Sequence, residues 1–227
     1  IDGLIVKKSS ELFGIVNVVF FSPEDLGIIK NGPAQRRHFI DLELCQLNKI
    51  YLHHLTNYQK VVNQRNNLLR QLVFSPALKD TLDVWDDQLV TYGCQVIEER
   101  RRFVRELNAL AGPIHDKLSG QKEKLKLIYE PCVEPESFRK TLQARRDNDI
   151  RLKTTTVGPH RDDINFIVNG IDIRKFGSQG QQRTAALSLK LAEIELVRQR
   201  INDTPVLLLD DVLSELDSFR QNYLLES

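Results

Sequence analysis

The sequence predicts an α/β fold in which an inserted α-helical hairpin interrupts a lobe that contains a sheet. Apolar, strand-like runs stand near both ends of the chain, at residues 16–21 and 205–209. Between about residues 35 and 111 the apolar side chains instead recur every three or four positions, which is the period of a helix. Strands at both ends with helices between them are typical of an α/β lobe that carries a helical insertion.

The composition is that of a globular protein with a sizeable core. Of the 227 residues, 41% are hydrophobic and 28% are charged, and the formal net charge is +1. We expect neither a membrane span nor a signal peptide, since no long apolar run and no charged leader occurs. Three scattered cysteines favour a reducing, cytoplasmic setting over a disulfide framework. Because the net charge is small, nucleic acid would have to bind through a local basic patch.

Two long helices are expected after the first strand, which Ser22-Pro23 interrupts. Residues 35–72 carry one apolar stripe, which amounts to about ten helical turns if the helix is unbroken. Ser75-Pro76 suits the start of a second helix, which reaches about residue 110. Because few residues join the two helices, we expect an antiparallel hairpin over residues 35–111.

The remainder of the chain mixes strands and helices. Alternating side chains predict strands at 122–129 and 164–168, and Asn169-Gly170 predicts a tight hairpin turn before a strand at 171–173. Helices are expected over about 135–150 and 179–201. The apolar run at 205–209 predicts a buried strand.

Two adjacent carboxylates, Asp210 and Asp211, end the last strand. The carboxyl end of such a strand lies at the rim of the sheet, where α/β proteins bind ligands. One carboxylate can hold Mg²⁺ through water while its neighbour orients an attacking water. The pattern is weak by itself, because apolar runs that end in two aspartates also occur by chance.

A second candidate is the start of the helix at residue 179. Ser178 can cap this helix, and Gly177 and Gly180 leave its first-turn amides open to an anion such as phosphate. The alternative is an ordinary Ser-capped helix. That alternative leaves Gly180 unexplained, because glycine costs about 1 kcal/mol relative to alanine inside a helix.

These motifs resemble those of the ABC-type ATPases, and the combination closely resembles the SMC-like RecF family of bacterial recombination and gap repair. The likeness covers essentially the whole chain. It identifies Ser178, Gln179, Gly180 and Gln181 with the signature motif. Asp210 corresponds to the Walker B magnesium aspartate and Asp211 to the catalytic carboxylate. Ser214 and Asp217 fall in the D-loop, and Ser22 and Glu24 fall at the Q-loop position.

The resemblance implies a division of the chain into three segments. Residues 1–30 are expected to be part of the ATPase lobe with the Q-loop-like joint, and residues 31–150 the helical lobe. Residues 151–227 are expected to return to the ATPase lobe. We expect the chain to be a fragment, because its sequence contains no Walker A phosphate-binding motif.

The resemblance also implies a function. ATP with Mg²⁺ would be held between two subunits, one of which offers its signature helix to the nucleotide of the other. The dimer would close on double-stranded or gapped DNA and open on slow hydrolysis, since Asp211 is one methylene shorter than the usual glutamate. The intact protein is expected to be a weak DNA-dependent ATPase with roles in replication and the SOS response, and RecR and RecO are the implied partners. Without a Walker A motif this chain alone is expected not to hydrolyse ATP.

Contacts with DNA are harder to assign. The candidate residues are basic and occur in pairs or runs: Arg36, Arg37, Arg100, Arg101, Arg139 and Arg145. The alternative for the run at residues 100–102 is a solvated helix face whose arginines pair with Glu98 and Glu99 at a spacing of four.

Two further interpretations remain open. Residues 160–163, His-Arg-Asp-Asp beside a Gly-Pro turn, are interpreted as a structural polar network that links the lobes rather than as a metal or nuclease cluster. The competing function is a non-catalytic interaction module whose helical hairpin docks a protein partner.

Overall fold

The computed structural model describes residues 16–211 and 220–221, and spatial contacts group the chain into two compact units. Unit 1 gathers the described residues up to Lys49, those of Phe103–Tyr129 and those from Ile164 onward. Unit 2 consists of Ile50–Arg102 and Glu130–Asp163. This grouping differs from the three predicted segments, because α4 (Leu82–Leu118) contributes its first half to unit 2 and its second half to unit 1.

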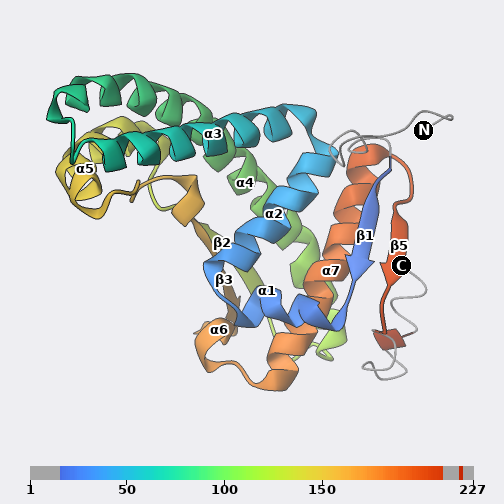
Figure 1. Cartoon of the computed structure of the whole chain (residues 1–227). Helices are drawn as coiled ribbons and strands as arrows, with labels where there is room; N and C mark the ends of the chain where they lie inside the picture. Colours follow the sequence, from blue (N-terminus) through green and yellow to red (C-terminus); the bar gives the residue numbers. More distant parts are fainter. Residues whose placement is uncertain (1–15, 212–219, 222–227) are drawn as a thin grey trace, which may run out of the picture. The chain divides into compact units, whose positions relative to one another are not determined.

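Unit 1 contains two small sheets and the helices that cover them (Figure 1). Besides the second half of α4, its elements are β1 (Val18–Phe21), η2 (Pro23–Asp25), α1 (Leu26–Lys30), α2 (Pro33–Leu47), β2 (Leu125–Glu130), β3 (Asp163–Val168), β4 (Ile171–Asp172), α6 (Ile173–Phe176), α7 (Gln179–Ile201) and β5 (Val206–Leu209).

β1 and β5 pair in parallel although they lie at opposite ends of the chain, with Val18 opposite Val206 and Phe21 opposite Leu209. Helix α7 packs against this pair, and their shared core includes Val19, Phe21 and the buried leucines and isoleucine of α7. The parallel pair confirms that the two ends of the sequence build one lobe.

The expectation that the last strand is buried is wrong. In β5 the side chains of Val206, Leu208 and Leu209 are 51%, 49% and 39% exposed. Within the described part of the chain, β5 pairs with β1 alone, so its other edge has no neighbouring strand. An apolar run predicts a strand but does not distinguish a central strand from an edge strand.

The second sheet has the strand order β2-β3-β4. Asn169 and Gly170 have φ values of 49° and 85°, so the predicted tight turn between β3 and β4 is confirmed. β4 is shorter than the predicted strand at 171–173, because Asp172 caps α6 through a 3.0 Å hydrogen bond that the Arg174 amide donates to its carboxylate. Ile173 therefore begins a helix.

Unit 2 is built on an antiparallel pair of helices. Its elements are α3 (Lys49–Gln71), η3 (Pro76–Thr81), the first half of α4, η4 (Pro135–Ser137), α5 (Phe138–Leu152) and η5 (Pro159–Arg161). Tyr51 bonds Arg100 and Arg65 bonds Asp86, so later residues of α4 meet earlier residues of α3. The predicted hairpin is therefore confirmed in unit 2.

The expected single helix over residues 35–72 is instead two helices. α2 ends at Leu47, and Asn48 adopts an extended backbone with φ −144° and ψ 101° before α3 begins. Asparagine has a low helix propensity, but the apolar stripe continues across it, so periodicity alone conceals the break. The predicted helix from Ser75 to about residue 110 also differs from the observed α4. A 3-10 turn precedes α4, and the helix continues through Pro113 to Leu118.

The segment at residues 160–163 forms a structural polar network, but the partners given below all lie in unit 2, so they do not provide the expected link between the lobes. His160 Nδ1 is 2.5 Å from the Tyr58 hydroxyl, and the ring's Nε2 is 3.0 Å from the Thr155 carbonyl. The buried Arg100 guanidinium donates to the Asp162 carboxylate at 3.2 Å and to the Pro159 carbonyl at 2.6 Å.

Among the described helices, none is both long and apolar enough to cross a membrane.

Candidate functional site

The carboxyl ends of β1 and β5 lie side by side and bring two predicted site segments together. The Asp210 amide donates a 2.9 Å hydrogen bond to the Phe21 carbonyl, so the Asp210 carboxylate follows directly beside the joint that starts at Ser22. Asp210 and Asp211 are both exposed at this rim. Asp211 has a φ of 49°, in the left-handed region that aspartate tolerates better than most residues.

The joint after β1 is a single 3-10 turn. Its geometry is fixed by Asp25, whose carboxylate accepts a 2.9 Å hydrogen bond from the Ser22 amide. Burial raises the pKa of Asp25, and the nearby Lys190 ammonium opposes this change. Glu24 is exposed beside it.

The start of α7 is closed by a capping box. Ser178 Oγ accepts the Gln181 amide at 3.2 Å, and Gln181 Oε1 accepts the Ser178 amide at 3.0 Å. The expectation that all first-turn amides are open is therefore wrong for Gln181. Its side-chain amide also donates to Glu123 Oε1 at 3.0 Å, which fixes the helix start against the segment before β2.

The space above Gly180 is open. A Cβ atom added there would meet only Ser178 Oγ, at 3.9 Å, so no packing contact within the described chain requires glycine. Ser178, Gln179 and Gly180 are all exposed. A bulky ligand can therefore approach the amides of the first turn, where the helix dipole favours an anion.

A cavity of about 360 Å³ connects the joint and the helix start. Its lining includes Ser22 and Asp25 from the joint and Gly180, Arg183 and Lys190 from α7. Neither Arg183 nor Lys190 was among the site residues predicted from the sequence. Arg183 follows Gly180 by three positions and Lys190 follows Arg183 by seven, and these spacings place all three on one face of α7.

Beneath this cavity lies a buried cluster of charges. Lys190 Nζ is 2.6 Å from Glu193 Oε2 and 5.5 Å from the ring centres of both Phe21 and Phe39. Burial raises the pKa of Glu193 well above its usual value, and it also raises the pKa of Glu43. One ammonium thus faces two buried carboxyl groups, so the cluster favours keeping a proton on one of them.

Several predicted DNA-contacting residues are unsuitable for that role. Arg36 and Arg100 are only 4% and 2% exposed. Arg36 donates to backbone carbonyls at the end of α1, including that of Asn31 at 2.6 Å, and Arg100 belongs to the polar network of unit 2. A buried guanidinium held by carbonyls cannot reach a phosphate, so both are removed from the candidates.

The other candidates differ in exposure. Arg101 pairs with Glu98 at 2.6 Å and also with Glu134. Glu98 and Arg101 are three residues apart, whereas the predicted spacing of such pairs was four. Arg139 is exposed and pairs with Asp87, Arg145 is exposed, and Arg37 is half-buried. The D-loop residues Ser214 and Asp217 lie outside the described residues.

Known proteins with similar sequences share one name. The chain is 63% identical over all 227 residues to the DNA replication and repair protein RecF of Lachnoclostridium phytofermentans and to that of Agathobacter rectalis. It spans 63% of the length of each of these relatives. No family model matches the chain.

Solved structures agree with this similarity. The recombination mediator protein RecF in the RecFOR pathway has been solved as RecF-ATP and as RecF-ATPrS. The TM-scores with this chain are 0.91 and 0.89, at 36% and 37% identity, and both matches cover 97% of this chain and 61% and 62% of the solved chains. The predicted fold class, an incomplete α/β ATPase lobe of the ABC type with an inserted helical hairpin, is thereby confirmed. This chain is therefore similar over its whole length to part of the RecF proteins.

Proposed function

We propose that the chain is the signature-bearing part of an ATP-dependent DNA-binding protein of recombinational repair. In this proposal ATP is held between two subunits, the dimer closes on duplex or gapped DNA, and slow hydrolysis opens it. The names of the RecF relatives support a role in DNA replication and repair, and the solved RecF-ATP structure supports a role for ATP. RecR and RecO are proposed partners, in keeping with the pathway named for the solved structures.

The observation that carries the proposal is the open space over the capped start of α7. Ser178, Gln179 and Gly180 are exposed, and nothing in the described chain occupies the position of a Gly180 side chain. Such a surface fits the triphosphate held by a second copy. Gln181 contributes by holding the cap rather than by presenting its amide.

The rim formed by Asp210 and Asp211 suits a hard cation. Both side chains are exposed carboxylates, which are the oxygen ligands that Mg²⁺ prefers. Asp210 would hold Mg²⁺ through water, and Asp211 would orient the attacking water. The metal would neutralise phosphate charge when bound. Ser22 and Glu24 at the joint, with Ser214 and Asp217, would complete the surroundings of the nucleotide.

The test uses a full-length RecF chimera in which this segment replaces the matching part of the L. phytofermentans protein. Ser178→Arg fills the open space with a long cationic side chain and removes the cap. We expect ATP-dependent dimerisation, measured by light scattering, to be lost while nucleotide binding by the monomer is retained. Ser178→Thr keeps a capping hydroxyl and is the matched control. Normal ATP-dependent dimerisation of the Ser178→Arg chimera would refute the proposed role.

A second candidate function rests on the turn after α3. Phe74 and Val73 are 87% and 52% exposed there, which suits a protein-docking module. Asp210→Asn in the chimera separates the two functions. An ATP-dependent clamp with this change would either trap or lose its DNA-bound dimer, whereas a docking module would be indifferent to it.

A further inference from the structure

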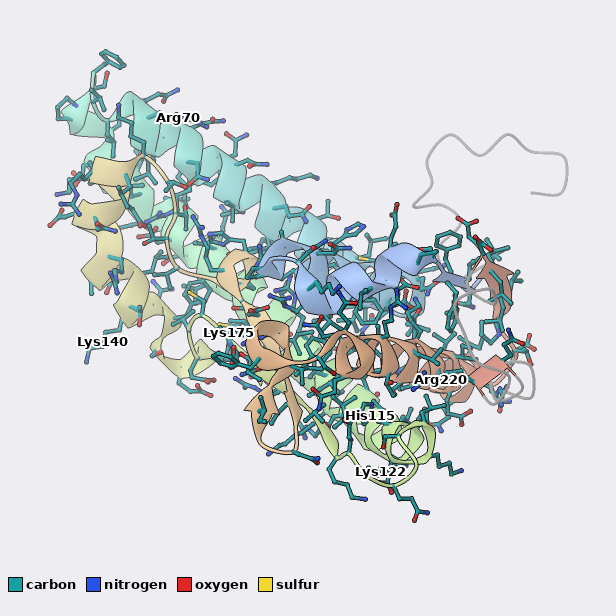
Figure 2. The ribbon with its side chains drawn as sticks, turned by 90° about the horizontal axis from the view of Figure 1, so that it is seen from below. Arg70, His115, Lys122, Lys140, Lys175 and Arg220 are labelled. Carbon is teal, nitrogen blue, oxygen red and sulfur yellow. The ribbon has the colours of Figure 1, made fainter. Side chains whose placement is uncertain are left out.

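A row of lysines lies on the segment that leads into β2 and on the start of β2 itself. Lys122, Lys124 and Lys126 are exposed, while Leu125 and Leu127 between and after them are buried. Side chains two residues apart on an extended chain share a face and are spaced about 6.6–6.8 Å apart. Figure 2 shows Lys122 at the outer edge of the ribbon.

The turn between β3 and β4 fixes this segment. Asn169 accepts the Lys124 amide on its side-chain oxygen at 2.9 Å, and its own amide donates to the Lys124 carbonyl at 3.2 Å. Its side-chain amide donates to the Lys122 carbonyl at 3.1 Å. The backbone of Lys122 and Lys124 is thus held by this turn, and Lys126 lies in β2 itself, so the three ammonium groups project from a fixed support.

The charges around the row leave it basic. Lys124 pairs with Asp116 at 2.7 Å yet stays 73% exposed, whereas Lys122 and Lys126 form no ion pair with the described residues. Glu123, the acidic residue within the segment, is directed to the other side. Its carboxylate oxygens lie 3.2 Å from His115 Nε2 and 3.0 Å from Gln181 Nε2.

We propose that Lys122, Lys124 and Lys126 form a contact surface for the phosphate backbone of duplex DNA. The inference rests on the proposed function, and it assigns DNA to residues outside the arginines predicted from the sequence. A regular row of cations at this spacing matches the repeat of phosphates along one strand. Ammonium groups on flexible stems contact phosphates as point charges, without reading base sequence.

The experiment measures binding of a fluorescein-labelled duplex of random sequence to the full-length chimera, with ATP present, at several salt concentrations. The variant is Lys122→Gln/Lys124→Gln/Lys126→Gln. Each lost phosphate contact reduces the slope of log affinity against log salt by about 0.9, so we expect the slope to fall by about two to three. Circular dichroism verifies that the variant remains folded, as expected for exposed substitutions.

The matched control is Lys30→Gln/Lys49→Gln/Lys60→Gln, which removes the same charge from exposed lysines elsewhere. The inference predicts that the control keeps the parent slope. Equal losses in both variants, an unchanged slope in the first, or an absence of salt-dependent binding by the parent would each overturn it.

Binding of polyglutamate, a model for an acidic protein, is measured in the same way. The inference would also be overturned if the triple lysine variant lost binding to polyglutamate but kept binding to DNA, because the surface would then fit an acidic protein. ATP-dependent dimerisation of the triple lysine variant, measured by light scattering, separates the two proposals. If the variant still dimerises with ATP, a change in DNA binding concerns this surface and not the role of Ser178.

Discussion

At the scale of single residues, His115 shows how burial and charge compete. Its ring is fully buried in unit 1, with Nδ1 3.0 Å from Ser188 Oγ and Nε2 3.2 Å from Glu123 Oε2. Burial lowers the pKa of His115 from its usual value of 6.5, and the Glu123 carboxylate opposes this change. The ring thus links Ser188 of α7 to the segment before β2, and burial favours its neutral form.

This arrangement predicts a pH-dependent stability. Because the folded protein gives His115 a lower pKa than the unfolded chain does, protons favour the unfolded chain. The contribution of this residue is complete above the unfolded pKa and falls as the pH drops below it. We expect the difference in Tm between the parent and His115→Gln to shrink between about pH 7.5 and about pH 5.5. Thermal melts by circular dichroism measure it, and a constant difference would contradict the expectation.

Single residues also mark the limits of sequence reasoning. The sequence correctly assigned the cap role to Ser178, because serine before a helix with a glutamine three residues later is a local signal. It could not identify Arg36 and Arg100 as buried, because burial depends on partners far along the chain. The carbonyls that bind Arg100 include that of Pro159, 59 residues away.

At the scale of elements, α7 was the most predictable. Its observed bounds, Gln179 to Ile201, equal the predicted ones, since Ser178 caps its start and Asn202 ends it in the left-handed conformation with φ 53°. The break at Asn48 and the exposure of β5 were missed. Both are decided by tertiary neighbours, while the apolar pattern records only the local period.

The charged cluster on α7 predicts a large effect for one substitution. Lys190 is 5% exposed and compensates two buried carboxyl groups, Glu43 and Glu193. Lys190→Met leaves these groups without a cation, so we expect a loss of about 3–5 kcal/mol near neutral pH. The loss should be smaller near pH 5 than near neutral pH, because the raised pKa values of Glu43 and Glu193 favour their neutral forms as the pH falls.

Denaturant unfolding at the two pH values measures this effect. The double variant Lys190→Met/Glu193→Leu is the control, because removing a buried charge together with its partner costs less than removing one alone. A loss that is equal at both pH values, or equal in the single and double variants, would show that packing rather than charge accounts for it.

At the scale of the whole molecule, the sequence contains segments that resemble the signature, Walker B and Q-loop motifs but no Gly-rich motif ending in Gly-Lys-Ser/Thr. The backbone amides of such a loop supply most of the cradle for the β- and γ-phosphates. We therefore expect the 227-residue chain alone to bind ATP too weakly to hydrolyse it. A titration with a fluorescent ATP analogue measures this, and micromolar affinity would contradict it, with the chimera as the positive control.

The two sides of the segment at residues 122–126 have different roles. One side presents the lysine row, and the other attaches through Glu123 to Gln181 at the beginning of α7. A strand segment this short cannot move on one side without displacing the other. If binding of duplex DNA to the lysine row changes the affinity for a nucleotide at α7, thermodynamic linkage requires the nucleotide to change the affinity for duplex DNA by the same factor.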